Sequence, residues 1–344
     1  MTIRVLLLLA GILALSIGAW AQNAEESIGC EANPTGNPIG GGEGYSDIRT
    51  TGDFTVKTKE ELLQALKDAK AGQIIFIPDG VEIDLTGERN ITLPAGVTLA
   101  GTRGLNGSPG ARIFTTLRQG HTLMVAGGDN VRLTGLRFEG AYGGTEKVSD
   151  HSNFVSMNYY GAEVDNCEVY NFNVVGIGVG QGAINVRVHH NYIHHCQRSG
   201  YGYGVATSSS DIHIIANRFD FCRHVIASSG APGCNYEAAW NLVGPNATSH
   251  HFDMHGGRDR GDSTDIAGDW LDIHHNTFLG TVSAVVIRGV PSQGAEVHHN
   301  WFAKPVAETV RSSGNTRAHS NVFGPEKTAQ EKPLEFVDGK PVEY

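Results

Sequence analysis

Three titratable residues alternate along one short stretch of this chain, at His251, Asp253 and His255. Alternate side chains of a strand point to the same face, so Phe252 and Met254 would be buried and the polar groups exposed together. An imidazole that titrates near neutrality can accept a proton, and a carboxylate beside it can orient the ring. The pattern indicates acid–base chemistry, with His255 as the base and Asp253 as an orienting or substrate-binding group.

Other side chains on neighbouring segments are expected on the same face. If Val285 and Ile287 point inward, then Arg288 points outward, where it could neutralise a carboxylate through paired hydrogen bonds. Such neutralisation makes the adjacent C–H bond of a uronic acid acidic. We expect Tyr203 to protonate a leaving oxygen. The residues expected to bind substrate are His224, His251, Arg258 and Arg311.

A repeat fixes the elements that carry these residues. An Asn followed after one or two residues by an apolar residue recurs at 166, 191, 217, 241, 276, 300 and 321, after short alternating apolar segments. A period of this length predicts a solenoid of stacked β-coils, here a right-handed parallel β-helix. The Asn amides are expected at a corner, where they would hydrogen-bond from coil to coil as a ladder. His-His pairs beside these residues fit a structural role.

One repeat unit is enlarged. Asn241 and Asn276 are 35 residues apart, about one-third more than in the other units, and the stretch from 249 to 269 lies between them. Insertions leave a solenoid at its corners and build walls beside a groove. The carboxylates of this insertion are candidate Ca²⁺ ligands, although their spacing matches no EF-type loop and also fits a solvated loop: Asp259, Asp262, Asp265 and Asp269. His250-His251, before the strand, fits either a functional or a structural role.

The remaining segments divide the chain. Residues 1–21 fit a signal peptide cleaved after Ala21, and residues 22–57 are rich in Gly and Pro. Thr58 would cap a helix that covers the N-terminal end of the β-helix domain, residues 58–325, and residues 326–344 form a charged tail. We therefore expect a secreted monomer, extracellular or periplasmic.

Charge and cysteine content bound the partners. The chain has 26 basic and 36 acidic residues, a net charge of -10, which argues against nucleic acid and anionic membranes. A polyanionic substrate would need a local basic cluster. Of five Cys residues, Cys196 and Cys222 both lie five residues after a repeat Asn, so they should stack. Either a disulfide or a reduced, buried pair fits this spacing.

Several segments resemble the pectate lyase superfamily of secreted β-helices. They are the Gly-rich 40–44, the helix after Thr58, residues 74–80, residues 97–101, and His298-His-Asn-Trp-Phe followed by Val310-Arg-Ser-Ser-Gly. Phe252-Asp-Met-His255 is similar to the Asp-Pro-His-Asp element of alginate C5-epimerases, in which the His is a base, and Val285-Val-Ile-Arg288 resembles the strand that supplies their Arg. Met254 and Gly256 depart from that element.

Together the residues and the resemblance predict a polysaccharide lyase that cleaves an acidic, uronic-acid polymer of the pectate or alginate type by β-elimination. A polyuronate C5-epimerase is the main alternative, since both reactions begin with the same proton abstraction. A non-catalytic carbohydrate-binding β-helix remains open, although the expected groove is cationic and has Tyr203 as its single aromatic residue. A hydrolase would need paired carboxylates, and the signatures of β-helical polygalacturonases are absent from the sequence.

Overall fold

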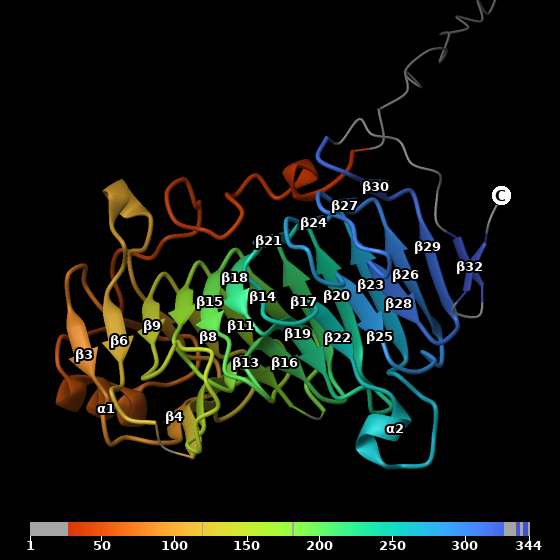
Figure 1. Ribbon diagram of the computed structural model, residues 1–344. Helices are drawn as coiled ribbons and strands as arrows, with labels where there is room; N and C mark the ends of the chain where they lie inside the picture. The colour runs from red at the N-terminus through yellow and green to blue at the C-terminus, as the bar shows by residue number, and fades with distance from the viewer. Residues whose placement is uncertain (1–26, 119, 181, 327–334, 338–339, 343–344) are drawn as a thin grey trace, which may run out of the picture.

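The computed structural model describes residues 27–118, 120–180, 182–326, 335–337 and 340–342. The predicted signal peptide lies outside these residues. Three parallel sheets run the length of an elongated tube, in which each coil contributes one strand to each sheet in turn (Figure 1). The predicted parallel β-helix is confirmed. In the described part of the chain, no helix combines the length and apolarity needed to cross a membrane.

The three sheets have eleven, nine and ten strands within the described residues. Sheet 1 contains β1 (Phe54–Thr55), β2 (Ile74–Phe76), β5 (Thr98–Ala100), β8 (Arg132–Thr134), β11 (Glu163–Asp165), β14 (Val186–His189), β17 (Asp211–Ile215), β20 (Asn235–Ala239), β23 (Trp270–His274), β26 (Gly294–His298) and β29 (Thr316–His319). Sheet 2 contains β4 (Ile91–Leu93), β7 (His121–Ala126), β10 (Ser152–Ser156), β13 (Val175–Val179), β16 (Tyr203–Thr207), β19 (His224–Ser228), β22 (Phe252–Met254), β25 (Val285–Ile287) and β28 (Val310–Ser312). Sheet 3 contains β3 (Glu82–Asp84), β6 (Arg112–Phe114), β9 (Arg137–Glu139), β12 (Glu168–Tyr170), β15 (Tyr192–Cys196), β18 (Arg218–Cys222), β21 (Leu242–Val243), β24 (Thr277–Phe278), β27 (Trp301–Phe302) and β30 (Val322–Phe323).

The core fills the tube with one apolar layer per coil. Inward residues stack on residues of the same kind in the next coil, as in the column formed by Phe278, Phe302 and Phe323, whose ring centroids are 5.2 and 5.1 Å apart. This spacing follows the distance between hydrogen-bonded strands. Each coil therefore repeats the register of its neighbour, and an outward residue on one strand faces outward residues on the next.

The Asn ladder lies at the corner between sheet 1 and sheet 3. The Asn191 amide donates to Asn217 Oδ1 at 3.0 Å, and the same bond recurs through Asn241, Asn276, Asn300 and Asn321. Each backbone N–H on the ladder also donates to the next amide oxygen, beginning with Cys167 N to Asn191 Oδ1.

The ladder therefore starts at Asn191, and the prediction that Asn166 belongs to it was wrong. Asn166 occupies the preceding corner position, where the backbone is left-handed (φ 51°) and where His190 (φ 53°) and Ala216 (φ 52°) lie in the next coils. Asn tolerates that conformation well, so its residue type fits both corner positions.

Helix α1 (Lys59–Asp68) covers the N-terminal end of the tube, as predicted (Figure 1). Thr58 caps it: its hydroxyl oxygen accepts a hydrogen bond from the Glu61 N–H, and the Glu61 carboxylate accepts one from the Thr58 N–H. Leu62 and Leu66 are buried in the core. The cap thus closes the apolar interior at the end where no preceding coil could cover it.

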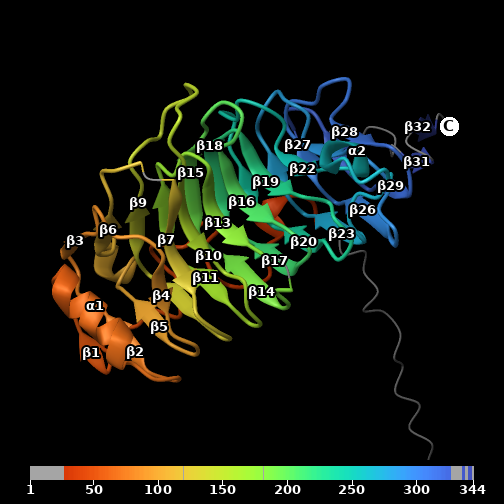
Figure 2. The same cartoon turned by 90° about the horizontal axis from the view of Figure 1, so that it is seen from below.

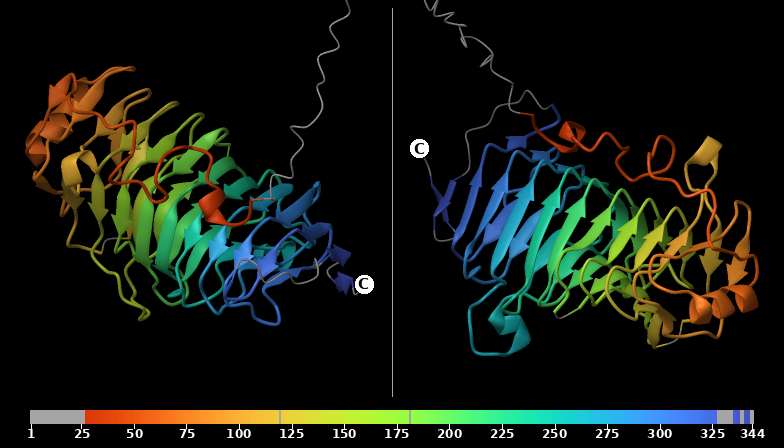
Figure 3. Two further views of the ribbon diagram at one scale, coloured as in Figure 1. Left: turned by 90° about the horizontal axis from the view of Figure 1, so that it is seen from above. Right: turned by 180° about the vertical axis from the view of Figure 1, so that it is seen from behind.

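Residues 27–50, which we call the N-terminal strap, run along the outside of the tube, against the direction in which the coils stack (Figure 3). The strap has no regular element longer than the 3₁₀ turn at Cys30–Ala32, as the Gly/Pro-rich sequence predicted. Its backbone is nevertheless anchored: Gly29 N donates to His299 O, and Gly40 N donates to Ala216 O. Strand β1, inside the segment predicted to be irregular, extends sheet 1 by one strand.

The cysteines and the His-His pairs occupy structural positions. Cys196 and Cys222 face each other on β15 and β18 as predicted, but both are free thiols, so the reduced stack is the correct alternative. At the sheet 1 corner, the rings of His274, His298 and His319 stack at 5.1 and 5.2 Å. Their Nε2 atoms contact carboxylates of the preceding coils at about 3 Å.

In the predicted tail, β31 (Glu335–Val337) and β32 (Lys340–Val342) form an antiparallel hairpin.

Candidate functional site

The candidate site lies on sheet 2, where β19, β22 and β25 are neighbours. Phe252 and Met254 are buried in the core, and Asp253 is opposite Ala227 and Val286 on the outer row, as the alternation predicted for β22. A bulge precedes this row, because the N–H groups of Val225 and Ile226 both donate to the carbonyl of His251. The inward and outward alternation of side chains that holds within β22 therefore does not extend back to His251, which precedes the strand. Ala227 lies on this outer row, paired with Asp253.

His251 is consequently inside the tube, and its predicted role in substrate binding is wrong. Its side chain is 0% exposed and packs against the ring of Phe278. Neither ring nitrogen has a hydrogen-bond partner among the described residues, and burial lowers the pKa of His251 to about 3. His250 takes the outward position instead, with Nε2 3.0 Å from Asp253 Oδ1.

Asp253 is the centre of the site. It was predicted to be exposed to solvent, but it is 0% exposed. Arg288, on the next coil, donates from Nε to Oδ1 at 2.9 Å and from Nη2 to Oδ2. His255 Nε2 lies 3.0 Å from Oδ2. Burial alone would raise the pKa of Asp253, but the imidazole and guanidinium contacts outweigh burial and hold that pKa well below its usual range. The carboxylate is therefore a fixed negative charge that orients the groups around it.

His255 and Arg288 are the most exposed members of this cluster. Their side chains are 32% and 34% exposed, as expected for groups that meet a substrate. Arg288 also donates from Nη1 to Asp259 Oδ1 at 3.0 Å, a contact that the sequence did not predict. Three of its five N–H groups are thus used within the protein, and two remain for a ligand.

Tyr203 and His224 lie on the two preceding strands and face the same side. Their rings stack with centroids 5.7 Å apart, and burial raises the pKa of Tyr203. The His224 side chain is 1% exposed and its Nδ1 donates to the carbonyl of His250, so its predicted direct contact with substrate is wrong. Its ring packs against the rings of Tyr203 and His250.

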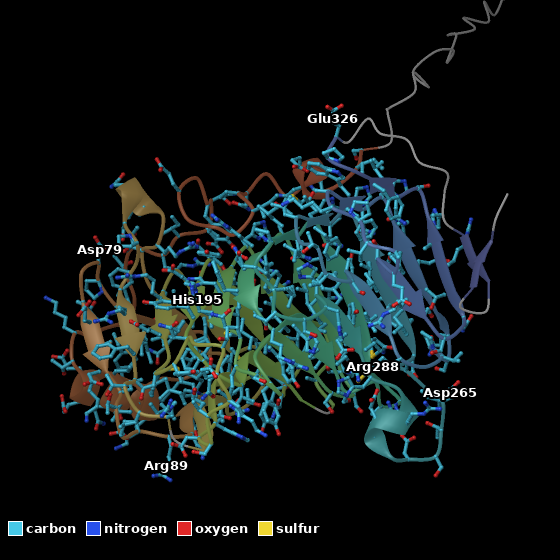
Figure 4. The ribbon with its side chains drawn as sticks, in the orientation of Figure 1. Asp79, Arg89, His195, Asp265, Arg288 and Glu326 are labelled. Carbon is cyan, nitrogen blue, oxygen red and sulfur yellow. The ribbon has the colours of Figure 1, made fainter. Side chains whose placement is uncertain are left out.

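Arg258, Arg288 and Arg311 line a groove, whereas Tyr203, Asp253 and His255, which were expected in the same groove, are not among its lining residues. The groove has a volume of about 420 Å³ and lies between β25, β28 and the insertion, which folds into the short helix α2 (Gly257–Arg260). Figure 2 shows α2 beside β22 and β28, and Figure 4 shows Arg288 beside the insertion that carries Asp265. The lining residues are Arg258, Asp259, Asp265, Val286, Ile287, Arg288, Arg311, Ser312 and Ser313.

Three of the four insertion carboxylates have separate partners. Asp259 binds Arg288, Asp262 binds Arg260 and Thr264, and Asp269 accepts from Ser292 and from the Gly233 N–H. Among the described residues, no three of the insertion's carboxylates converge closely enough to hold one ion. Two of them shape the wall of the groove, since Asp259 and Asp265 belong to its lining.

A second buried aspartate, Asp165 on sheet 1, forms a comparable cluster. Arg132 donates to both of its oxygens at 2.7 Å, and the hydroxyls of Tyr45 and Thr134 each donate to Oδ2 at 2.8 Å. Glu163 next to it contacts His189 Nε2 at 2.8 Å. Tyr45 belongs to the N-terminal strap, so this cluster fastens the strap to the tube.

Comparisons with known proteins bear on the fold. No protein-family model and no curated protein sequence matches the chain. Its structure is similar to that of an alginate lyase from Paenibacillus sp. str. FPU-7 (TM-score 0.59, 16% identity, covering 79% of this chain and 95% of that one). Two further structures match with lower scores. They are Jun a 1, the major allergen from cedar pollen (TM-score 0.45, 14% identity, 86% and 82% covered), and the A-module of a mannuronan C-5 epimerase from Azotobacter vinelandii (TM-score 0.38, 13% identity, 75% and 70% covered).

At these identities the likeness concerns the fold alone. The fold predicted from the sequence is thereby confirmed: this chain is a right-handed parallel β-helix.

Proposed function

We propose that this protein is a secreted polysaccharide lyase that cleaves a uronic-acid polymer by β-elimination. The observation that carries the proposal is the set of three guanidinium groups around one groove, from Arg258, Arg288 and Arg311, with the His255–Asp253 pair attached to it through Arg288. On a chain with net charge -10, such a local cationic site favours an acidic ligand over a neutral one.

In the proposed reaction, a base removes the C5 proton of a uronate residue, the C4–O4 bond breaks, and a C4=C5 double bond forms. Negative charge develops on the sugar carboxylate as the proton leaves. The two free N–H groups of Arg288, together with Arg258 or Arg311, are suited to stabilise that charge. Asp253 and Asp259 hold Arg288 in place before substrate binds.

His255 is the proposed base. With Nε2 3.0 Å from the Asp253 carboxylate, the ring proton is best held at Nε2, which leaves Nδ1 as the acceptor for the C5 proton. Asp253 is then a positioning residue. Tyr203, whose raised pKa keeps its hydroxyl protonated at neutral pH, is the proposed donor to the leaving O4.

A C5-epimerase is the second candidate, because Asp253, His255 and Arg288 match the epimerase-like strand pair noted in the sequence and make direct contacts. Epimerisation shares the proton abstraction but returns a proton to the opposite face of C5 and leaves the chain intact. Alginate is the first substrate to test, since both the alginate lyase and the epimerase resemble this chain in fold.

The test is to incubate the mature protein with alginate, polygalacturonate and glycosaminoglycans in deuterated water. We expect ultraviolet absorbance from unsaturated products with one of these polymers. Exchange of the C5 proton without cleavage would identify an epimerase, and new reducing ends without unsaturation would identify a hydrolase. Binding of a polymer with none of these products would make the protein a carbohydrate-binding module.

A further inference from the structure

Beneath the proposed catalytic pair, three potential metal ligands converge on one point. His224, His250 and Asp253 each present one ligand atom, and these atoms all lie within 4.8 Å of one another. His250 Nε2 is 3.0 Å from Asp253 Oδ1, and His224 Nε2 is 3.8 Å from Oδ2. The side chains of His224 and Asp253 are 1% and 0% exposed.

The positions of the ring protons make this arrangement unusual. His224 Nδ1 is 2.6 Å from the carbonyl oxygen of His250, which can only accept, so Nδ1 must carry the proton. In the neutral ring, Nε2 then has a lone pair that faces the negative Asp253 carboxylate. Two acceptors that face each other repel unless a positive species lies between them.

His250 adds a second such atom. Its buried Nε2 lies 3.0 Å from Asp253 Oδ1, but the two atoms do not meet in hydrogen-bond geometry, while its Nδ1 lies 3.4 Å from Ser249 Oγ. A buried polar atom without a partner is unfavourable and calls for an explanation. Binding of one cation between His224, His250 and Asp253 would satisfy all three groups.

The other His and carboxylate cluster of similar size provides a contrast. Glu163, Asp165 and His189 also lie within 4.8 Å of one another. There, however, Arg132, Tyr45 and Thr134 fill the Asp165 oxygens, and both nitrogens of His189 have partners. That cluster needs no further ligand.

We propose that His224, His250 and Asp253 bind a divalent transition-metal ion such as Zn²⁺. Two imidazoles and one carboxylate suit Zn²⁺ and its neighbours, whereas Ca²⁺ prefers six to eight oxygen ligands. Asp253 can keep its bonds to Arg288, because each carboxylate oxygen has two lone pairs. The proposal goes beyond the lyase function and concerns binding, so it does not require that function.

The test is calorimetric titration of Zn²⁺ into the metal-stripped mature protein, purified without a histidine tag. We expect one site per chain, with affinity at least tenfold lower in the His224→Ala and His250→Ala variants. His189→Ala is the matched control and should bind as the unaltered protein does. With Co²⁺ as a probe, the unaltered protein should develop visible absorption bands that are absent from the two site variants. Ca²⁺ should not compete.

Absence of stoichiometric Zn²⁺ binding would overturn the proposal, as would binding that persists in both site variants, which would mark adventitious binding at the surface histidine stacks. Far-ultraviolet circular dichroism and the milder His250→Gln variant guard against misfolding, and His250→Gln should also lose affinity. Activity assayed in parallel separates the two proposals. Zn²⁺ binding at this site without turnover of any uronan would keep the metal site and overturn the lyase, whereas turnover without Zn²⁺ binding would do the reverse.

Discussion

Asp165 and Asp253 are both buried on the tube, and each is held by two hydrogen bonds from an arginine on a neighbouring coil. Their surroundings differ. Asp165 is completed by hydroxyl groups and covered by the N-terminal strap, so its partners are all internal. Asp253 is surrounded by imidazoles. The Nε2 atom of His250 has no hydrogen bond among the described residues, and the Nε2 atom of His224 faces the Asp253 carboxylate. The arginine that binds Asp253, Arg288, is one-third exposed and lies beside a groove. The Asp165–Arg132 pair thus holds the strap to the tube, whereas the Asp253–Arg288 pair can also contact a bound ligand.

The largest expected effect separates the two clusters by activity. His255→Ala should lower turnover by about 10²-fold or more, the usual scale for loss of a general base, with little change in stability. His213→Ala, which removes a similarly exposed histidine paired with Glu237 on sheet 1, should leave turnover unchanged. Equal rates for the two variants would remove His255 from the reaction.

Asp165→Asn should lower the free energy of unfolding by about 3 kcal/mol, because Arg132 would lose a buried, doubly bonded partner. Denaturant titration measures this loss. The folded variant should retain its activity, since this cluster lies away from the groove. If Asp165→Asn instead abolished turnover without destabilising the protein, the division between cohesive and functional clusters would fail.

Arg288→Lys should lower activity about tenfold or more, because an ammonium cannot form the paired contacts with Asp253 and a substrate carboxylate. The loss should be larger than for Arg187→Lys, whose side chain binds Glu163 at the surface of sheet 1. Steady-state kinetics of both variants provide the comparison, and a fully active Arg288→Lys protein would exclude the proposed carboxylate contact.

The smallest effect concerns acid stability. Burial would raise the pKa of Glu163, but bonds from His189 and the nearby Arg132 charge outweigh burial and lower the pKa to about 2. A depressed carboxyl pKa adds stability that is fully present above about pH 4.5 and is lost as the pH falls toward 2. Glu163→Gln should flatten this part of the stability profile, as measured by denaturant titration between pH 5 and 2. An unchanged profile would show that Glu163 does not contribute.

The repeat predicted the fold because each coil must place the same residue types at the same corner and inside the same tube. It predicted that Asp253, His255 and Arg288 share a face, because β22 and β25 keep strict alternation. The bonds from Arg288 to Asp253 and Asp259 could not be predicted, since side-chain rotamers are not part of a periodic pattern. Asn166 was misplaced because asparagine suits both adjacent corner positions.

The bulge explains the remaining errors at the site. Two N–H groups share the His251 carbonyl, and this backbone feature leaves no mark in residue types. The adjacent histidines at 250 and 251 are chemically identical, so composition could not indicate which one faces outward. His250 is the neighbour of Asp253 that alternation missed, and the pair itself was its only signal.

The N-terminal strap forms hydrogen bonds with coils that lie far from it in the sequence and are synthesised much later. Gly29 donates to His299 and Cys30 donates to Thr277, so the first residues of the strap bond to nearly the last coils. A solenoid whose coils contact only their neighbours can unfold coil by coil from its ends. Here the strap cannot dock until the late coils exist, and once docked it must detach before they fray independently. Folding therefore ends with a long-range closure that should make unfolding of the stack more nearly all-or-none.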